Sequence, residues 1–133
     1  KLISLVKELK LEKEVIFLDN IDQKLKISLI QNSNLFLMPS IKYKRSVEGF
    51  GISFIEAASY GVGSIGGKDG GAEDAIRNNE TGLICDGEDI SSIYSSILEF
   101  LKNENYKRFG SNAIKFSENF SWKKIIRKYL DLI

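Results

Sequence analysis

The sequence predicts an α/β fold, a parallel sheet with helices on both faces. Short, almost continuously apolar runs alternate along the chain with longer segments whose apolar residues recur at helical spacing. Strands that are apolar along their whole length are typical of parallel sheets covered on both faces. With 133 residues, the chain is expected to form a single domain, residues 1–133.

The first half of the chain alternates helix and strand signals. Leucine and valine recur at helical spacing over residues 2–9, which predicts an opening helix. Residues 15–18 form an apolar run with a β-branched start, closed by Asp-Asn, which predicts a strand. Helical spacing over residues 25–30 follows an aspartate, and residues 35–38 form a second apolar run that Pro-Ser ends. A strand expected before the opening helix is absent, so the chain resembles a fragment of a longer protein.

The second half continues the alternation. Apolar residues at helical spacing over 52–59 predict a helix that stops near Gly61. A poorer strand is expected over residues 64–66, a short helix over 72–77 and an apolar strand over 83–85. Three further helices are expected over residues 90–101, with Asp89 as N-cap, 106–116 and 122–132.

Composition excludes several classes of function. The net charge of +1 gives no field that would attract nucleic acid, and no apolar run approaches the roughly 20 residues that span a bilayer. The chain has no histidine, which removes the commonest general base and most zinc sites. Cys85 is the single cysteine and lies in an apolar run, so we expect a small core residue in a cytoplasmic protein.

The segment after the 35–38 strand carries the chemistry. It reaches Glu48-Gly49-Phe50-Gly51 and then enters a helix. Helix N-termini leave backbone N–H groups unpaired, and glycines without Cβ atoms let a phosphate approach them. We expect the N–H groups of Phe50, Gly51 and Ile52 to be the phosphate donors.

Two carboxylates frame that helix start. Glu48 precedes the helix and Glu56 lies on it among apolar neighbours. Because carboxylates repel phosphates, sugar hydroxyls are their suitable partners. The alternative is purely structural: a tight strand-to-helix turn, a helix-start charge and a solvated glutamate. Spacing alone leaves both interpretations open.

Together these residues resemble the retaining glycosyltransferase family 4, whose GT-B fold has two Rossmann-like halves, and specifically the C-terminal half. The resemblance covers nearly the whole chain. It rests on five blocks, each weak alone: Val15 to Asp19; Pro39-Ser40 with Glu48 to Gly51; Glu56-Ala57-Ala58-Ser59-Tyr60-Gly61; Gly70-Gly71 with Asp74, Ile76 and Thr81 to Ile84; and Phe120-Ser121-Trp122.

The resemblance implies roles for these residues. Glu48 would contact hydroxyls of the donor sugar and is the candidate catalytic residue. Glu56 would hold the ribose diol, and Gly49 with the following amides would hold the diphosphate of a nucleotide sugar. Asp19, Asn20 and Ile21 would lie against the base. The family transfers sugar with retention, to saccharide or lipid-linked acceptors, and needs no metal or other cofactor.

Two departures limit the resemblance. Gly63 stands where the family usually has proline, so the third strand is expected to start loosely. The family's diphosphate-binding Arg and Lys, and its acceptor-binding half, belong upstream of Lys1. We therefore expect the isolated chain to bind donor weakly and to transfer nothing.

Weaker features have ordinary explanations. The basic loop over residues 42–45 is usually solvated, although it could meet donor phosphates, acceptor or an anionic membrane. The basic face of the last helix usually serves solubility, with peripheral contact to anionic lipid at the inner membrane face as the alternative. Trp122 is expected to be a packing anchor. The rival functions are a non-enzymatic nucleotide-binding or interaction module and a nucleotide-sugar epimerase of the same architecture.

Overall fold

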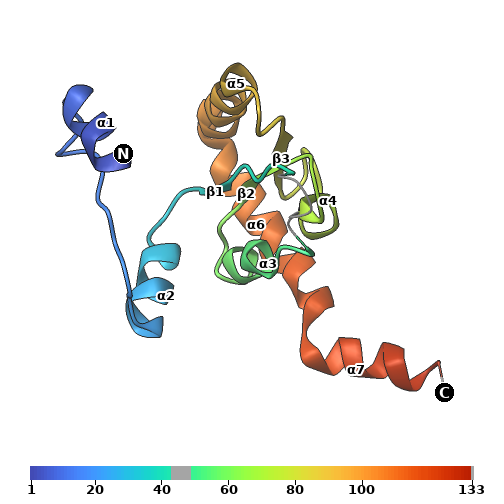
Figure 1. The fold of residues 1–133 in the computed structure, drawn as a ribbon. Coiled ribbons are helices and arrows are strands. Elements are labelled where there is room, and N and C mark those ends of the chain that lie inside the picture. Colours follow the sequence, from blue (N-terminus) through green and yellow to red (C-terminus); the bar gives the residue numbers. More distant parts are fainter. Residues whose placement is uncertain (43–48, 133) are drawn as a thin grey trace.

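The computed structural model describes residues 1–42 and 49–132 of the chain. Figure 1 shows the order of its elements, with the first two helices set apart from a body built around the strands. The helices are α1 (Leu2–Glu8), α2 (Gln23–Gln31), α3 (Ile52–Ser59), α4 (Ala72–Ala75), α5 (Ile90–Leu101), α6 (Asn105–Ser117) and α7 (Trp122–Leu130). The strands are β1 (Phe36–Met38), β2 (Ser64–Gly67) and β3 (Gly82–Cys85).

The three strands form one parallel sheet in the order β1-β2-β3. Phe36 is opposite Ser64, and Ile65 is opposite Leu83. Parallel neighbours need a crossover between them, and α3 and α4 lie in those connections. The predicted parallel α/β fold is confirmed.

Each face of the sheet has its own apolar core. On one face Ile65, Leu83 and Cys85 pack with Phe100 and Phe109, whose rings stack with centroids 4.9 Å apart. The opposite face packs against α3 and α4. The core on that face consists of Phe54, Ala72, Ala75 and Ile76, with Phe36, Met38 and Ile84 partly buried against them. The expected burial of Cys85 is confirmed, since its exposed fraction is 3%.

Two helix starts follow the expected capping rule. The Asp22 carboxylate accepts a hydrogen bond from the Leu25 N–H at 2.8 Å and so caps α2. The Asp89 carboxylate accepts one from the Ser91 N–H at 2.9 Å and so caps α5. Each carboxylate occupies a donor that the helix itself leaves unpaired.

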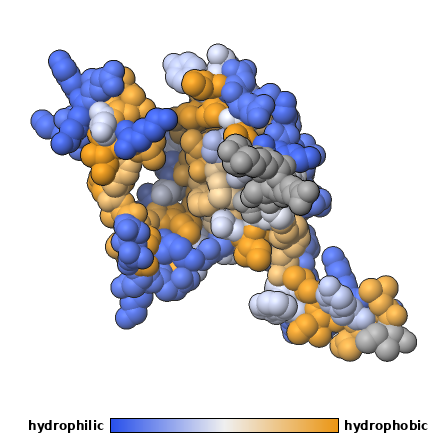
Figure 2. Space-filling model, in the orientation of Figure 1, coloured by the Kyte–Doolittle hydropathy of each residue, from blue (hydrophilic) through white to orange (hydrophobic). Residues whose placement is uncertain are grey.

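The strand predicted over residues 15–18 is wrong. Within the described ranges this segment pairs with no strand, and Ile16 and Leu18 expose 79% and 52% of their surface. An apolar run indicates that a segment should be buried, but a strand also needs a neighbour to accept its backbone hydrogen bonds. Figure 2 shows the apolar side chains of this connection at the surface between α1 and α2.

Two smaller expectations are also wrong. The start of β2 is not loose, because a Cβ atom on Gly63 would lie 2.7 Å from the Phe109 Cβ. Trp122 does not anchor the packing, since 79% of its surface is exposed. Across the described part of the chain, no helix has the length and apolar content needed to cross a membrane.

Candidate functional site

The loops that follow the three strands converge at the carboxyl edge of the sheet. A Cβ atom on Gly67, at the end of β2, would lie 2.0 Å from the Ser40 carbonyl oxygen. One on Gly87, after β3, would lie 2.5 Å from the Pro39 carbonyl oxygen. The backbones therefore touch directly, and ligands of open parallel sheets bind at this edge.

The two glycine segments singled out from the sequence meet at that edge. A Cβ atom on Gly71 would lie 1.6 Å from the Gly49 carbonyl oxygen and 2.8 Å from the Phe50 Cα. The position of a Cβ on Gly49 has no described atom within 4 Å. Gly71 thus allows the backbone contact, and none of the described residues fills the space beside the Gly49 Cα.

Gly51 caps α3 in a conformation that suits glycine. Its φ of 75° and ψ of 53° lie in the left-handed region. The Phe54 N–H donates to the Gly51 carbonyl oxygen at 2.9 Å, which leaves the N–H groups of Ile52 and Ser53 ahead of the first bond back to the cap. The N-terminus of α3 therefore presents N–H groups that no described atom accepts, together with partial positive charge, beside the contact between Gly49 and Gly71.

Glu56 lies in the second turn of α3. Its carboxylate has a partner that sequence reasoning missed. The Lys26 Nζ of α2 lies 2.7 Å from the Glu56 Oε1, and the two side chains expose 38% and 27% of their surface. The sequence could not predict this pair, because a lysine in an amphipathic helix does not indicate its partner and the two residues are thirty positions apart (56 minus 26).

A groove of about 340 Å³ separates α2 from the start of α3. It is lined by Ile21, Lys26, Leu29, Ile30, Ser33, Phe36, Ser53 and Glu56. The structure thus brings two predicted site residues, Ile21 and Glu56, to one surface. Asp19 and Asn20 are exposed and lie outside this lining, and Glu48 falls outside the described residues.

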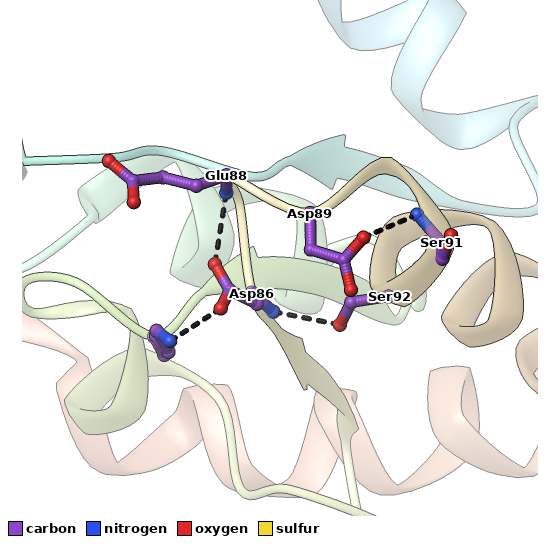
Figure 3. A network of polar contacts seen from close by, with 6 residues as sticks. Asp86, Glu88, Asp89, Ser91 and Ser92 are labelled. Carbon is purple, nitrogen blue, oxygen red and sulfur yellow. Dashed lines mark hydrogen bonds and ion pairs between the residues drawn. The ribbon is translucent and has the colours of Figure 1, made fainter.

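A second polar cluster at the same sheet edge was not anticipated (Figure 3). Lys68 follows β2 and Asp86 follows β3, and the lysine Nζ lies 2.5 Å from the carboxylate Oδ2. The Glu88 N–H donates to Asp86 Oδ1, and the Asp86 N–H donates to the Ser92 hydroxyl, each at 3.0 Å. Opposite charges directly after neighbouring parallel strands are the sequence signal that could have found this pair.

The same cluster shifts two ionisation equilibria. The hydrogen bond from Lys68, assisted by the Glu88 N–H, holds the pKa of Asp86 below its ordinary value. The hydrogen bond to Asp86 correspondingly raises the pKa of Lys68. Both groups are charged near neutral pH, so this pair adds no net charge to the sheet edge.

An apolar groove adjoins the glycine segment on its other side. It measures about 260 Å³ and lies between α3 and the start of α7. The Phe50 and Phe120 rings meet within it at a centroid distance of 5.3 Å. Its remaining lining residues are Ile52, Ile55, Trp122 and Ile125.

A parallel sheet with a glycine-bracketed helix N-terminus at its carboxyl edge is the arrangement at which open α/β proteins bind their ligands. Residues 1–116 match the family model described as "Glycosyl transferases group 1". The chain therefore belongs to the group 1 glycosyltransferases. The resemblance to family 4, and to the C-terminal part of its GT-B fold, is confirmed.

Curated relatives span several activities. The chain is 32% identical over 133 residues to N-acetyl-alpha-D-glucosaminyl L-malate synthase of Bacillus anthracis, covering 96% of this chain and 32% of that protein. It is 30% identical over 101 residues to sucrose-phosphate synthase 4 of Arabidopsis thaliana, covering 75% of this chain and 9% of that protein. The chain thus spans about a third, or less, of the length of these relatives.

Solved structures share the fold. Sucrose-phosphate synthase from Thermosynechococcus elongatus superposes with a TM-score of 0.82 at 25% identity, covering 98% of this chain and 32% of that one. An Anabaena protein, solved in complex with UDP and glucose, superposes with a TM-score of 0.77 at 20% identity, covering 99% and 36%. The second likeness concerns the fold alone.

Proposed function

We propose that this chain is the donor-binding region of a retaining glycosyltransferase. The whole protein would transfer a sugar from a nucleotide-diphosphate sugar to a saccharide or lipid-linked acceptor, in the synthesis of surface polysaccharide or glycolipid. The observation that carries the proposal is the backbone contact of Gly49 and Gly71 beside the N-terminus of α3, with Glu56 on that same helix.

The diphosphate is assigned to the amides of Phe50, Gly51 and Ile52. Close approach is supported by Gly49, because no described atom lies within 4 Å of its Cβ position, and the α3 N-terminus favours an anion. Negative charge grows on the diphosphate as the sugar–phosphate bond breaks. Fixed amides stabilise that charge without reorganising, which lowers the barrier to transfer.

The nucleoside is assigned to the groove between α2 and α3. Glu56 would accept hydrogen bonds from the ribose diol, and Ile21, with Asp19 and Asn20 before it, would lie against the base. The shared lining of Ile21 and Glu56 supports this assignment. Glu48 is proposed to contact hydroxyls of the donor sugar as the catalytic residue. The reaction is proposed to retain configuration and to need no metal.

Two similar proteins support a nucleotide-sugar donor. One solved neighbour holds UDP and glucose, and one relative, 42% identical over 55 residues, is a GDP-mannose-dependent mannosyltransferase of Mycobacterium tuberculosis. A cytoplasmic location with peripheral membrane contact is also proposed. It is supported by α7, which carries Arg127 and Lys128 in its last turn and exposes 68% of Tyr129 and 64% of Leu130.

Titration calorimetry of the chain with UDP, GDP and ADP tests the donor site. Glu56→Ala should weaken the tightest of these roughly 10- to 100-fold, because hydrogen bonds to a charged group contribute about 1.5–3 kcal/mol. Glu12→Ala removes an exposed carboxylate outside the groove and should leave affinity unchanged. Equal affinity in wild type and Glu56→Ala would refute the ribose role.

The two rival functions predict different results. Of the non-enzymatic alternatives, an interaction module would bind none of the three nucleoside diphosphates, whereas a nucleotide-binding module would bind one of them and the whole protein would transfer no sugar. An epimerase would convert the nucleotide sugar without an acceptor, which product analysis by chromatography detects. Measurable glycosyl transfer by the isolated chain would overturn the expectation that this region binds donor but transfers nothing.

A further inference from the structure

The ion pair between Lys26 and Glu56 is the one polar bridge across the groove that the described residues form. Lys26 lies three residues before Leu29 and four before Ile30, so the three share one face of α2, and Ser33 follows just after the helix. Ser53 and Glu56, three residues apart, form the facing edge of α3. The Lys26 side chain therefore extends from α2 to the Glu56 carboxylate on the opposite side of the groove.

The geometry of that pair leaves half of the carboxylate available. Lys26 lies against Oε1 at 2.7 Å, and within the described ranges no hydrogen bond to Oε2 occurs. An ionised carboxylate offers about four lone-pair sites over its two oxygens. One ammonium contact on Oε1 thus leaves Oε2 as an acceptor on a residue that lines the groove.

We propose that Lys26 is the positioning residue that makes this site selective for ribonucleotides. By holding Oε1 of Glu56, it fixes the glutamate side chain with Oε2 turned toward the groove, where the 2′- and 3′-hydroxyls of a ribose donate to it. This proposal rests on the proposed function, since it concerns the same nucleotide site.

Two physical effects favour such an arrangement. A free glutamate samples several rotamers, and fixing it only when ligand binds costs affinity. The pair removes that cost before the ligand arrives. Lys26 also cancels the charge of Glu56, so the groove does not present a bare carboxylate to a ligand that carries a diphosphate.

The test compares two ligands on a set of variants. The ligands are the nucleoside diphosphate that the wild-type chain binds most tightly among UDP, GDP and ADP, and its 2′,3′-dideoxy counterpart. The measured quantity is the ratio of their dissociation constants. Charge effects on the diphosphate act equally on both ligands and cancel in this ratio, whereas the fixing of Glu56 does not cancel.

The variants separate positioning from other roles. Lys26→Met should lower the dideoxy-to-ribo ratio about tenfold, toward the value for Glu56→Gln. Lys26→Arg, which keeps a donor for Oε1, should retain most of the ratio. Lys24→Met removes a lysine two positions away on the exposed side of α2 and should change nothing. Circular dichroism checks that each variant is folded, and Lys26→Gln replaces Lys26→Met if the latter is not.

Each outcome is decisive. If Lys26→Met keeps the wild-type ratio, or weakens both ligands equally, the positioning role is wrong while the donor site stands. If the wild-type chain prefers the ribonucleotide no more than the dideoxynucleotide, Glu56 does not read the diol and this inference fails with that assignment. If no nucleoside diphosphate binds, the proposed function itself fails.

Discussion

Replacing Gly51 with alanine should destabilise the folded chain by about 2–5 kcal/mol. The left-handed conformation, with φ of 75°, costs a residue with a Cβ atom about 1–2 kcal/mol. The new Cβ would also lie 2.6 Å from Cδ2 of the buried Phe54 ring, and overpacking of this kind costs typically about 1–3 kcal/mol. Because small domains are stable by about 5–15 kcal/mol in total, the loss is large.

Gly49→Ala is the matched control, two residues away in the same segment. No described atom lies within 4 Å of its Cβ position. The substitution should change stability by no more than about 0.5 kcal/mol. It should nevertheless weaken nucleoside diphosphate binding, because the methyl group would occupy the space through which a phosphate reaches the α3 amides.

Urea unfolding followed by circular dichroism measures the first effect, and titration calorimetry measures the second. A lower unfolding midpoint at unchanged slope is expected for Gly51→Ala only. Coincident unfolding curves for Gly51→Ala and wild type would refute the steric argument at the helix cap. Wild-type affinity in Gly49→Ala would refute the proposed path of the phosphate.

Two further predictions concern titratable groups. The pKa of Asp86 is held low in the folded chain chiefly by its hydrogen bond from Lys68, so the stability from that shift is present above the ordinary carboxyl pKa and is lost as pH falls through the folded value. Asp86→Asn keeps an acceptor for the Glu88 N–H but loses this titration. Its urea midpoint should therefore decline less steeply than that of the wild type between about pH 5 and pH 2, and an equally steep decline would contradict the prediction. Burial raises the pKa of the Cys85 thiol, so the folded chain should resist alkylation by iodoacetamide at pH 8 and react only as it unfolds in urea. Mass spectrometry detects the alkylated cysteine, and rapid alkylation without urea would show that the thiol is accessible.

The sheet could be predicted because a strand that is buried on both faces must be apolar at consecutive positions of the sequence. Leu83 and Ile84 are adjacent and pack into opposite cores, so β3 had to be apolar along its length. The same kind of apolar run gave a wrong strand prediction at residues 15–18, because it indicates that a segment needs burial and not that a neighbouring strand is present. Trp122 shows the same limit, since a large aromatic side chain does not specify what covers it.

The site was predictable in part, for a different physical reason. Glycines with required roles, such as Gly51, are visible because few other residues tolerate a left-handed cap. Ion pairs between separate elements are not visible in this way. Lys26 lies on a helix where any polar residue would suit an exposed face, and only the packing of α2 beside α3 gives it Glu56 as a partner.

These ion pairs bear on how the chain can hold a diphosphate. Lys26 is engaged by Glu56, and Lys68 at the same sheet edge is engaged by Asp86. Neither pair contributes net positive charge, so in the described part of the site the favourable field for the phosphates comes from the α3 N-terminus, equivalent to about half an elementary charge. A nucleoside diphosphate carries several times that charge in the opposite sense. We therefore expect this chain to bind a donor weakly, because its own lysines are paired, and we expect strong stabilisation of a departing diphosphate to require cations beyond these two.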